Sequence, residues 1–177
     1  MLRLLLAYLT FPGVMVHEAA HAWACRRLGI AVHRVCYLRL GNPMGYVLHE
    51  RPAYAVQHIM VAVAPFFVST AAALAVSLAA TVFIASHVLE GFQDIVRPLS
   101  MWIGFSIALH AFPSSGDADS LWDDVRSPEV GLIAKLVLVP VVGMIRLAGA
   151  GSRLWLDVLY AVTVVAVPPL IVAAALL

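Results

Sequence analysis

The chain has 177 residues, of which 63% are hydrophobic and only 12% are charged. A soluble domain carries about 25% charged residues, so this composition excludes an ordinary soluble domain. The formal net charge of +1 gives no sign of a polyanion partner, and we expect no nucleic-acid binding. The length and the long apolar runs predict a single membrane domain over residues 1–177, in contact with the lipid bilayer.

The first apolar segment, about residues 2–28, is predicted to span the membrane. Pro12 and Gly13 interrupt it and predict a kink just before a polar cluster. A secretory signal peptide is the alternative, because Arg3 precedes a leucine-rich run. Glu18 and its two neighbouring histidines lie where the apolar region of such a peptide should end, which disfavours that alternative.

Residues 31–50 change in character and predict a short β-hairpin at the membrane surface. Two stretches of β-prone residues flank the turn cluster 41–45, which contains two glycines and a proline. A hairpin of this kind leaves a strand edge to which an extended substrate could add as a further strand. Asn42, within the turn, is expected chiefly to serve the turn and is a weaker candidate for substrate contact.

Four further apolar segments bring the prediction to an all-α polytopic membrane protein of about five transmembrane helices. Pro65 is expected to divide the longest segment into a short leading helix and a span. A polar loop is expected over 87–94, and a turn over 114–120, with a helix beginning near Leu121. The four predicted spans cover about residues 53–86, 95–112, 130–148 and 154–177.

Positive residues predict the orientation in the membrane. The loop after the first span carries more of them than any other loop, so the positive-inside rule places it in the cytoplasm. A competing loop with Arg146 and Arg153 falls on the opposite side, so the rule is followed by a majority of the charges. The positive residues of the first loop are Arg26, Arg27, Arg34, Arg39 and Arg51.

The polar cluster in the first predicted span is an H-E-x-x-H motif, His17-Glu18-Ala19-Ala20-His21. Residues four apart share one face of a helix, so both imidazoles can reach one metal ion. Glu18 is the candidate catalytic base, since a carboxylate beside such a metal can take a proton from its water. The alternative is that these groups cap a helix end or form buried hydrogen bonds between helices. Ionisable groups within a hydrophobic span are costly, which favours the functional interpretation.

The segment from His17 to Val32 resembles the metal-binding segment of the site-2 protease family of intramembrane metalloproteases. In both, the H-E-x-x-H helix runs into a basic pair, a glycine-hydrophobic step and a β-structured segment. The resemblance covers about the first two-thirds of the chain. It implies Zn²⁺ held by two histidines and an aspartate, and cleavage of membrane-spanning protein substrates.

The third ligand is less clearly marked. In that family it comes from an Asn-x-x-Pro…Asp-Gly arrangement after the third core span, whereas this chain has His110-Ala111-Phe112-Pro113 and no Asp-Gly. Asp117 and Asp119 flank the expected position. Asp117 is preferred, because the preceding Gly116 allows close backbone approach, and Asp119 is the alternative ligand or a helix cap.

Three other polar residues have less specific interpretations. His110 could contact the substrate or hydrogen-bond another helix. Cys25 shares the face of His21 and could be a soft ligand, although packing between helices is favoured. His58 is expected to form a polar contact between helices or at the interface.

These residues together predict an intramembrane zinc metalloendopeptidase with its active site toward the cytoplasmic side of the membrane. The alternative is a zinc-binding membrane regulator or a metal transporter without peptidase activity. A transporter should carry ionisable residues along a path through several spans. The later spans offer only Lys135 and Asp157, which disfavours transport.

Overall fold

The computed structural model describes residues 2–86, 91–128 and 130–175. This part of the chain is mostly helical and contains one small antiparallel sheet, which confirms the predicted helical class and the hairpin. Its helices are α1 (Leu2–Leu9), α2 (Phe11–Arg27), α3 (Ala55–Ala85), α4 (Gln93–Leu109), α5 (Ser115–Arg126), α6 (Leu132–Arg153) and α7 (Leu156–Ala175). Its strands are β1 (Val32–Cys36) and β2 (Tyr46–His49), paired so that Cys36 lies opposite Tyr46.

Three helices within the described residues are long and apolar enough to cross a membrane, namely α3, α6 over Leu132–Ser152, and α7. The sequence predicted about five membrane spans, which is more than the structure supports. The predicted first span divides at Thr10 into α1 and α2, and the Thr10 hydroxyl donates to the Leu6 carbonyl at the break. The predicted span 95–112 is the helix α4, whose 17 residues make it shorter than the other three.

Helix α3 is continuous through Pro65, so the prediction that this proline divides the segment is wrong. The proline is fully buried, and packing on every side holds the helix together despite the missing N–H. With 31 residues, α3 is about 46 Å long, which exceeds the roughly 30 Å hydrocarbon thickness of a bilayer. One helix therefore takes part in two layers of the molecule.

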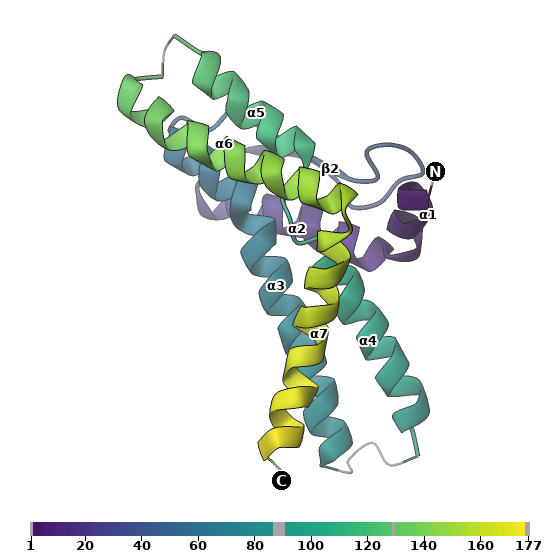
Figure 1. Ribbon diagram of the computed structural model, residues 1–177. Helices are drawn as coiled ribbons and strands as arrows, with labels where there is room; N and C mark the ends of the chain where they lie inside the picture. The colour runs from purple at the N-terminus through teal and green to yellow at the C-terminus, as the bar shows by residue number, and fades with distance from the viewer. Residues whose placement is uncertain (1, 87–90, 129, 176–177) are drawn as a thin grey trace.

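Figure 1 shows these two layers. The second half of α3 forms a lower bundle with α4 and α7, whereas α2, α5 and α6 gather around its first half, with α1 and the hairpin beside them. Separate apolar clusters hold the layers together: Ala73, Ala108 and Ala161 below, and Ala62, Leu121 and Leu138 above. Small residues in both clusters let the helices approach closely.

Two of the predicted loops are partly helical. Of the polar loop expected over 87–94, residues 87–90 lie outside the described residues, and α4 already begins at Gln93. The turn expected over 114–120 is instead the start of α5 at Ser115. Both aspartates proposed as ligands therefore lie on a helix.

Candidate metal centre

Helix α2 carries the H-E-x-x-H motif between well-defined ends. Pro12 occupies its first turn, where the missing backbone N–H costs no hydrogen bond, and Arg26 and Arg27 in its last turn complement the helix dipole. His17 and His21 are both buried on the face that packs toward the rest of the upper layer. The prediction that the two imidazoles share a face is confirmed.

Helix α5 brings the third group. Ser114 caps it: its hydroxyl accepts from the Asp117 N–H, while the Asp117 carboxylate accepts from the Ser114 N–H and hydroxyl at 2.6 and 2.7 Å. This is a capping box, with an aspartate at the third helical position. The same interactions hold the carboxylate rigidly, so Asp117 both starts the helix and faces the histidines.

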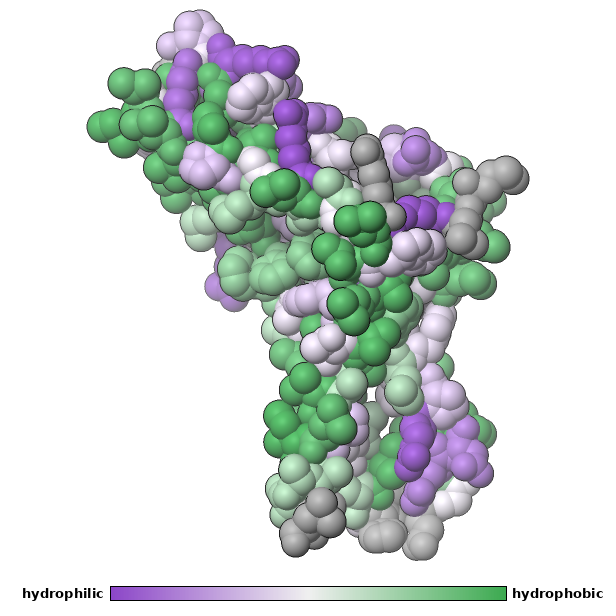
Figure 2. Space-filling view, viewed as in Figure 1, coloured by the Kyte–Doolittle hydropathy of each residue, from purple (hydrophilic) through white to green (hydrophobic). Residues whose placement is uncertain are grey.

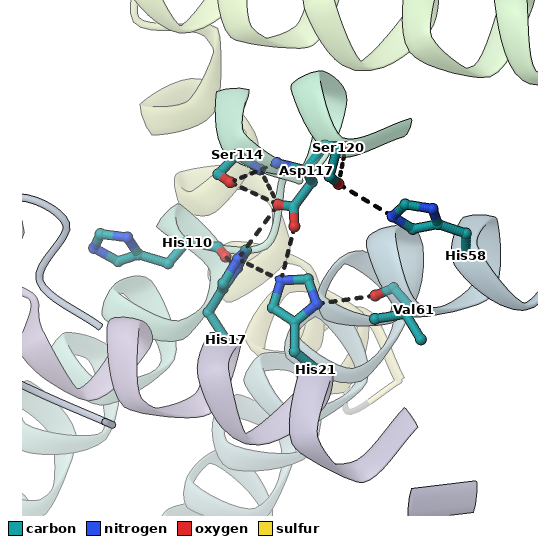
Figure 3. A network of polar contacts seen from close by, with 8 residues as sticks. All are labelled: His17, His21, His58, Val61, His110, Ser114, Asp117 and Ser120. Atoms are coloured by element: carbon teal, nitrogen blue, oxygen red, sulfur yellow. Dashed lines mark hydrogen bonds and ion pairs between the residues drawn. The ribbon is translucent and has the colours of Figure 1, made fainter. Parts of the chain in front are cut away.

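The three groups converge on one point (Figure 3). The Nε2 atoms of His17 and His21 lie 3.2 Å apart, and the Asp117 carboxylate lies 3.3 Å from the Nε2 of His21 and 4.0 Å from that of His17. Ligands of tetrahedral zinc are separated by about 3.3 Å, given zinc–nitrogen distances near 2.0–2.1 Å. Two of the three separations are close to this value and the third is about 0.7 Å longer, so a small adjustment of the side chains would let them hold a zinc ion, with a fourth position left for water.

Backbone carbonyls determine which nitrogens face the centre. The Nδ1 of His17 donates to the His110 carbonyl at 2.7 Å, and the Nδ1 of His21 donates to the Val61 carbonyl at 2.9 Å. Because a carbonyl can only accept, both neutral imidazoles present an unprotonated Nε2 to the centre. Two nitrogen lone pairs and a carboxylate then face one another, an arrangement that a metal ion at the centre, or a proton on one imidazole, would stabilise.

The Asp117 carboxylate is available as a ligand over a wide pH range. Burial alone would raise its pKa, but when the histidines are protonated the hydrogen bond from His21 and the charges of both imidazoles, together with the bond from Ser114, lower the pKa to about 2. A metal ligand must be deprotonated, and this carboxyl group is already ionised at neutral pH.

Glu18 lines a cleft of about 660 Å³ that also reaches His17. The turn of the hairpin covers it: a Cβ placed on Gly45 would lie 2.6 Å from the Glu18 Cγ and 3.0 Å from its Oε1. Only glycine allows the turn to approach the carboxylate this closely. The hairpin thus forms one wall of the cleft in which Glu18 lies.

Asn42 and His110 also line this cleft. In Figure 3 the His110 imidazole points away from Asp117, and its Nε2 contacts the Thr10 hydroxyl at 2.8 Å. The backbone carbonyl of His110, rather than its side chain, is what orients His17. Sequence analysis missed this carbonyl, that of Val61 and the role of Ser114; of these, only the Ser114 capping box has a sequence signal.

The remaining candidates lie away from the centre. Asp119 is exposed and pairs with Arg146 at 3.2 Å, and it caps no helix, because Ser114 does so. Gly116 has ordinary space for a Cβ, so close backbone approach does not explain the choice of Asp117. Cys25 is buried in an apolar cluster with Ala64, which confirms packing as its role. Asp157 pairs with Arg3 at 2.7 Å.

A second polar cluster lies beside the centre. His58 on α3 bonds Asp124 through Nδ1 at 2.6 Å and contacts the Ser120 hydroxyl through Nε2 at 3.1 Å. Arg51 completes the cluster with a 2.6 Å ion pair to Asp124. The prediction that His58 joins helices is confirmed, and through Ser120 this cluster fastens α5 to α3 one turn beyond Asp117.

No family model, curated protein or solved structure matches this chain. The function of this chain is therefore inferred from its side chains and their geometry.

Proposed function

We propose that this protein is an intramembrane zinc metalloendopeptidase that hydrolyses peptide bonds of membrane-spanning protein substrates. The observation that supports it most directly is the convergence of the Nε2 atoms of His17 and His21 with the Asp117 carboxylate. Both imidazoles are oriented by carbonyls, as the ligands of metal sites commonly are. Glu18 follows His17 directly in the chain and lines the same cleft.

The residues present fit zinc in ligand type, number and spacing. Zinc at this centre would polarise the scissile carbonyl and lower the pKa of a bound water to about 7. Glu18 then takes a proton from the attacking water as its oxygen bonds the carbonyl carbon. When the carbon–nitrogen bond breaks, Glu18 returns that proton to the departing amine. His17, His21 and Asp117 hold the centre in place throughout.

The cleft and the hairpin support a peptide substrate. A helix hides its carbonyls in its own hydrogen bonds, so a membrane-spanning substrate must unwind before hydrolysis. A strand edge beside the Gly45 turn could hold the unwound segment extended, by strand addition. Asn42 lies in that turn and lines the cleft, so it would contact the unwound segment.

The decisive experiment is Glu18→Gln, measured for both zinc content and cleavage of a membrane-embedded reporter. The substitution keeps the size of the side chain but removes its ability to act as a base. Zinc content should stay near wild type, while the cleavage rate falls by about 10²–10⁴-fold. Glu50→Gln is the matched control, because Glu50 is an exposed hairpin carboxylate outside the cleft.

Equal cleavage by Glu18→Gln and wild type would refute the peptidase mechanism. Full zinc binding without cleavage by the wild-type protein would instead favour the zinc-binding regulator or the transporter.

The orientation is a separate proposal, in which the protein is an integral multi-pass membrane protein with its active site toward the cytoplasm. The positive residues of the hairpin loop support it. An Asn42→Cys variant, with Cys25 and Cys36 replaced by serine, should react only with thiol reagents that enter the cytoplasm. Labelling of intact cells by an impermeant reagent would invert the orientation.

A further inference from the structure

The lower bundle contains a groove of about 810 Å³, separate from the metal centre. Its walls come from residues 77–85 of α3, 97–105 of α4 and 162–173 of α7. Figure 2 shows the molecule hollowed between the lower parts of α7 and α4. Since α3 and α7 are both long and apolar enough to cross a membrane, the groove faces hydrocarbon when they do.

The hydroxyl groups in the groove wall already donate their protons to backbone carbonyls. Ser77 donates to the Val165 carbonyl, Thr81 to that of Ser77 and Ser100 to that of Val96, each at 2.7 Å. An unwound peptide in the groove would need hydrogen-bond partners for its backbone, because no water is available in hydrocarbon. An alkyl chain needs none, so the wall suits an acyl chain.

The size of the groove also favours a small occupant. A transmembrane helix of 20 residues, taken as a cylinder about 10 Å wide and 30 Å long, fills roughly 2,400 Å³. That is about three times the groove. Pockets for single ligand molecules have volumes of about 300–1,000 Å³, which includes the observed 810 Å³.

Among the described residues that line the groove, Arg97 alone has a charged side chain. It lies at the end where α4 begins and α3 and α7 end, which is the level of the lipid headgroups if these helices span the bilayer. Among the described residues no carboxylate forms an ion pair with it. A guanidinium presents paired N–H donors that match phosphate oxygens, and it is weakly hydrated enough to bind them at an interface.

We propose that this groove is a binding site for an anionic phospholipid, with acyl chain in the groove and phosphate on Arg97. A zwitterionic lipid carries a cation beside its phosphate, which lessens the attraction to Arg97. The site should therefore prefer phosphatidylglycerol to phosphatidylcholine with the same acyl chains. One cation near an anionic lipid surface contributes about 1 kcal/mol, which corresponds to about a fivefold preference.

Trp102 provides a local probe, because it lines the groove. The full chain with Trp23, Trp122 and Trp155 replaced by phenylalanine is reconstituted into phosphatidylcholine vesicles. Quenching of Trp102 fluorescence is then measured with brominated phosphatidylglycerol or brominated phosphatidylcholine at equal mole fraction. Brominated phosphatidylglycerol should associate about fivefold more strongly.

Two substitutions in this background test the two halves of the site. Arg97→Gln should remove the preference for phosphatidylglycerol, while Arg126→Gln, a matched control on α5, should retain it. Ala166→Phe should fill the groove and lower the quenching of Trp102 by both lipids. If that variant fails to fold, Ala80→Leu fills the groove from the α3 wall and should lower quenching in the same way.

Two outcomes would overturn the proposal. One is that both brominated lipids quench Trp102 equally, and that the Arg97→Gln variant gives the same equal quenching. The other is quenching by both lipids that rises as the protein is diluted in the vesicles, since a second copy of the chain would then cover the groove. Neither outcome depends on metal content or peptidase activity.

Discussion

Two histidine–carboxylate clusters lie side by side in the upper layer, each with a carboxylate from α5, and their charged and hydrogen-bonding groups are paired in different ways. At Asp124, the carboxylate faces the Arg51 guanidinium and the His58 imidazole, and both nitrogens of that imidazole have partners. At Asp117, the carboxylate faces two imidazoles whose protons are directed to carbonyls elsewhere. The Asp124 cluster pairs a carboxylate with a cationic side chain, whereas the Asp117 cluster brings together three groups that could hold a metal ion.

The two clusters show what distinguishes a candidate metal site from a structural polar cluster. Residue types are nearly the same in both, since each contains histidine, aspartate and a serine hydroxyl. The difference lies in the balance of donors and acceptors, which the backbone partners of the histidines determine. The following predictions separate the two clusters.

The largest difference should be in bound zinc. His17→Ala and His21→Ala each remove one of three protein ligands, so the purified protein should fall from about one zinc per chain to almost none. His58→Ala should keep its zinc, because His58 is not among the converging groups. Metal analysis by mass spectrometry measures all three variants, and full zinc retention in both α2 variants would refute the metal centre.

The two aspartates near the start of α5 should differ strongly in their effect on affinity. Asp117→Asn removes a charged ligand and should weaken zinc binding by more than the 10- to 100-fold typical of outer-shell partners. Asp119→Asn should leave affinity unchanged, because its carboxylate is exposed and paired with Arg146. Competition with a zinc chelator gives both affinities. Equal affinities for the two variants would mean that the third ligand lies elsewhere.

Asp124→Asn should affect stability rather than metal. The substitution removes a buried charge from between Arg51 and His58, so we expect a loss of about 2–3 kcal/mol in the free energy of unfolding. Zinc content per folded chain should stay at the wild-type level. Unfolding in mixed detergent–SDS micelles gives the stability. A loss of zinc from the folded variant would show that the two clusters act as one unit.

The smallest effect is expected at Ser114, which supports the ligand without touching the metal. Ser114→Ala removes the helix cap and one hydrogen bond to Asp117, which should cost about 1 kcal/mol of stability. Zinc affinity should fall by about 10-fold, as for other outer-shell partners. Ser114→Thr keeps a hydroxyl cap and should restore both. An alanine variant with wild-type affinity would show that the Ser114 backbone N–H alone orients Asp117.

Much of the fold and part of the centre could be predicted from local sequence. The apolar runs predict α7 with nearly its observed bounds and α6 with its start, although α6 continues to Arg153, beyond the predicted end at 148. The turn cluster 41–45 predicts the hairpin. The four-residue spacing of His17 and His21 places both on one face of α2 whatever surrounds them. Helical periodicity and turn chemistry act over a few residues, so sequence alone specifies them.

From the residues alone it follows that this chain is rich in membrane-type helices, that two histidines share a helix face and that aspartates come soon after the third long apolar segment. Tertiary packing was needed to bring Asp117, and not Asp119, beside the two histidines and to keep α3 unbroken at Pro65. It also left three candidate membrane-crossing helices among the described residues. It also supplied the carbonyls of Val61 and His110, which orient the imidazoles from 40 and 93 residues away. A backbone carbonyl has no residue-type signature, so its role depends on how α3 and α4 pack against α2.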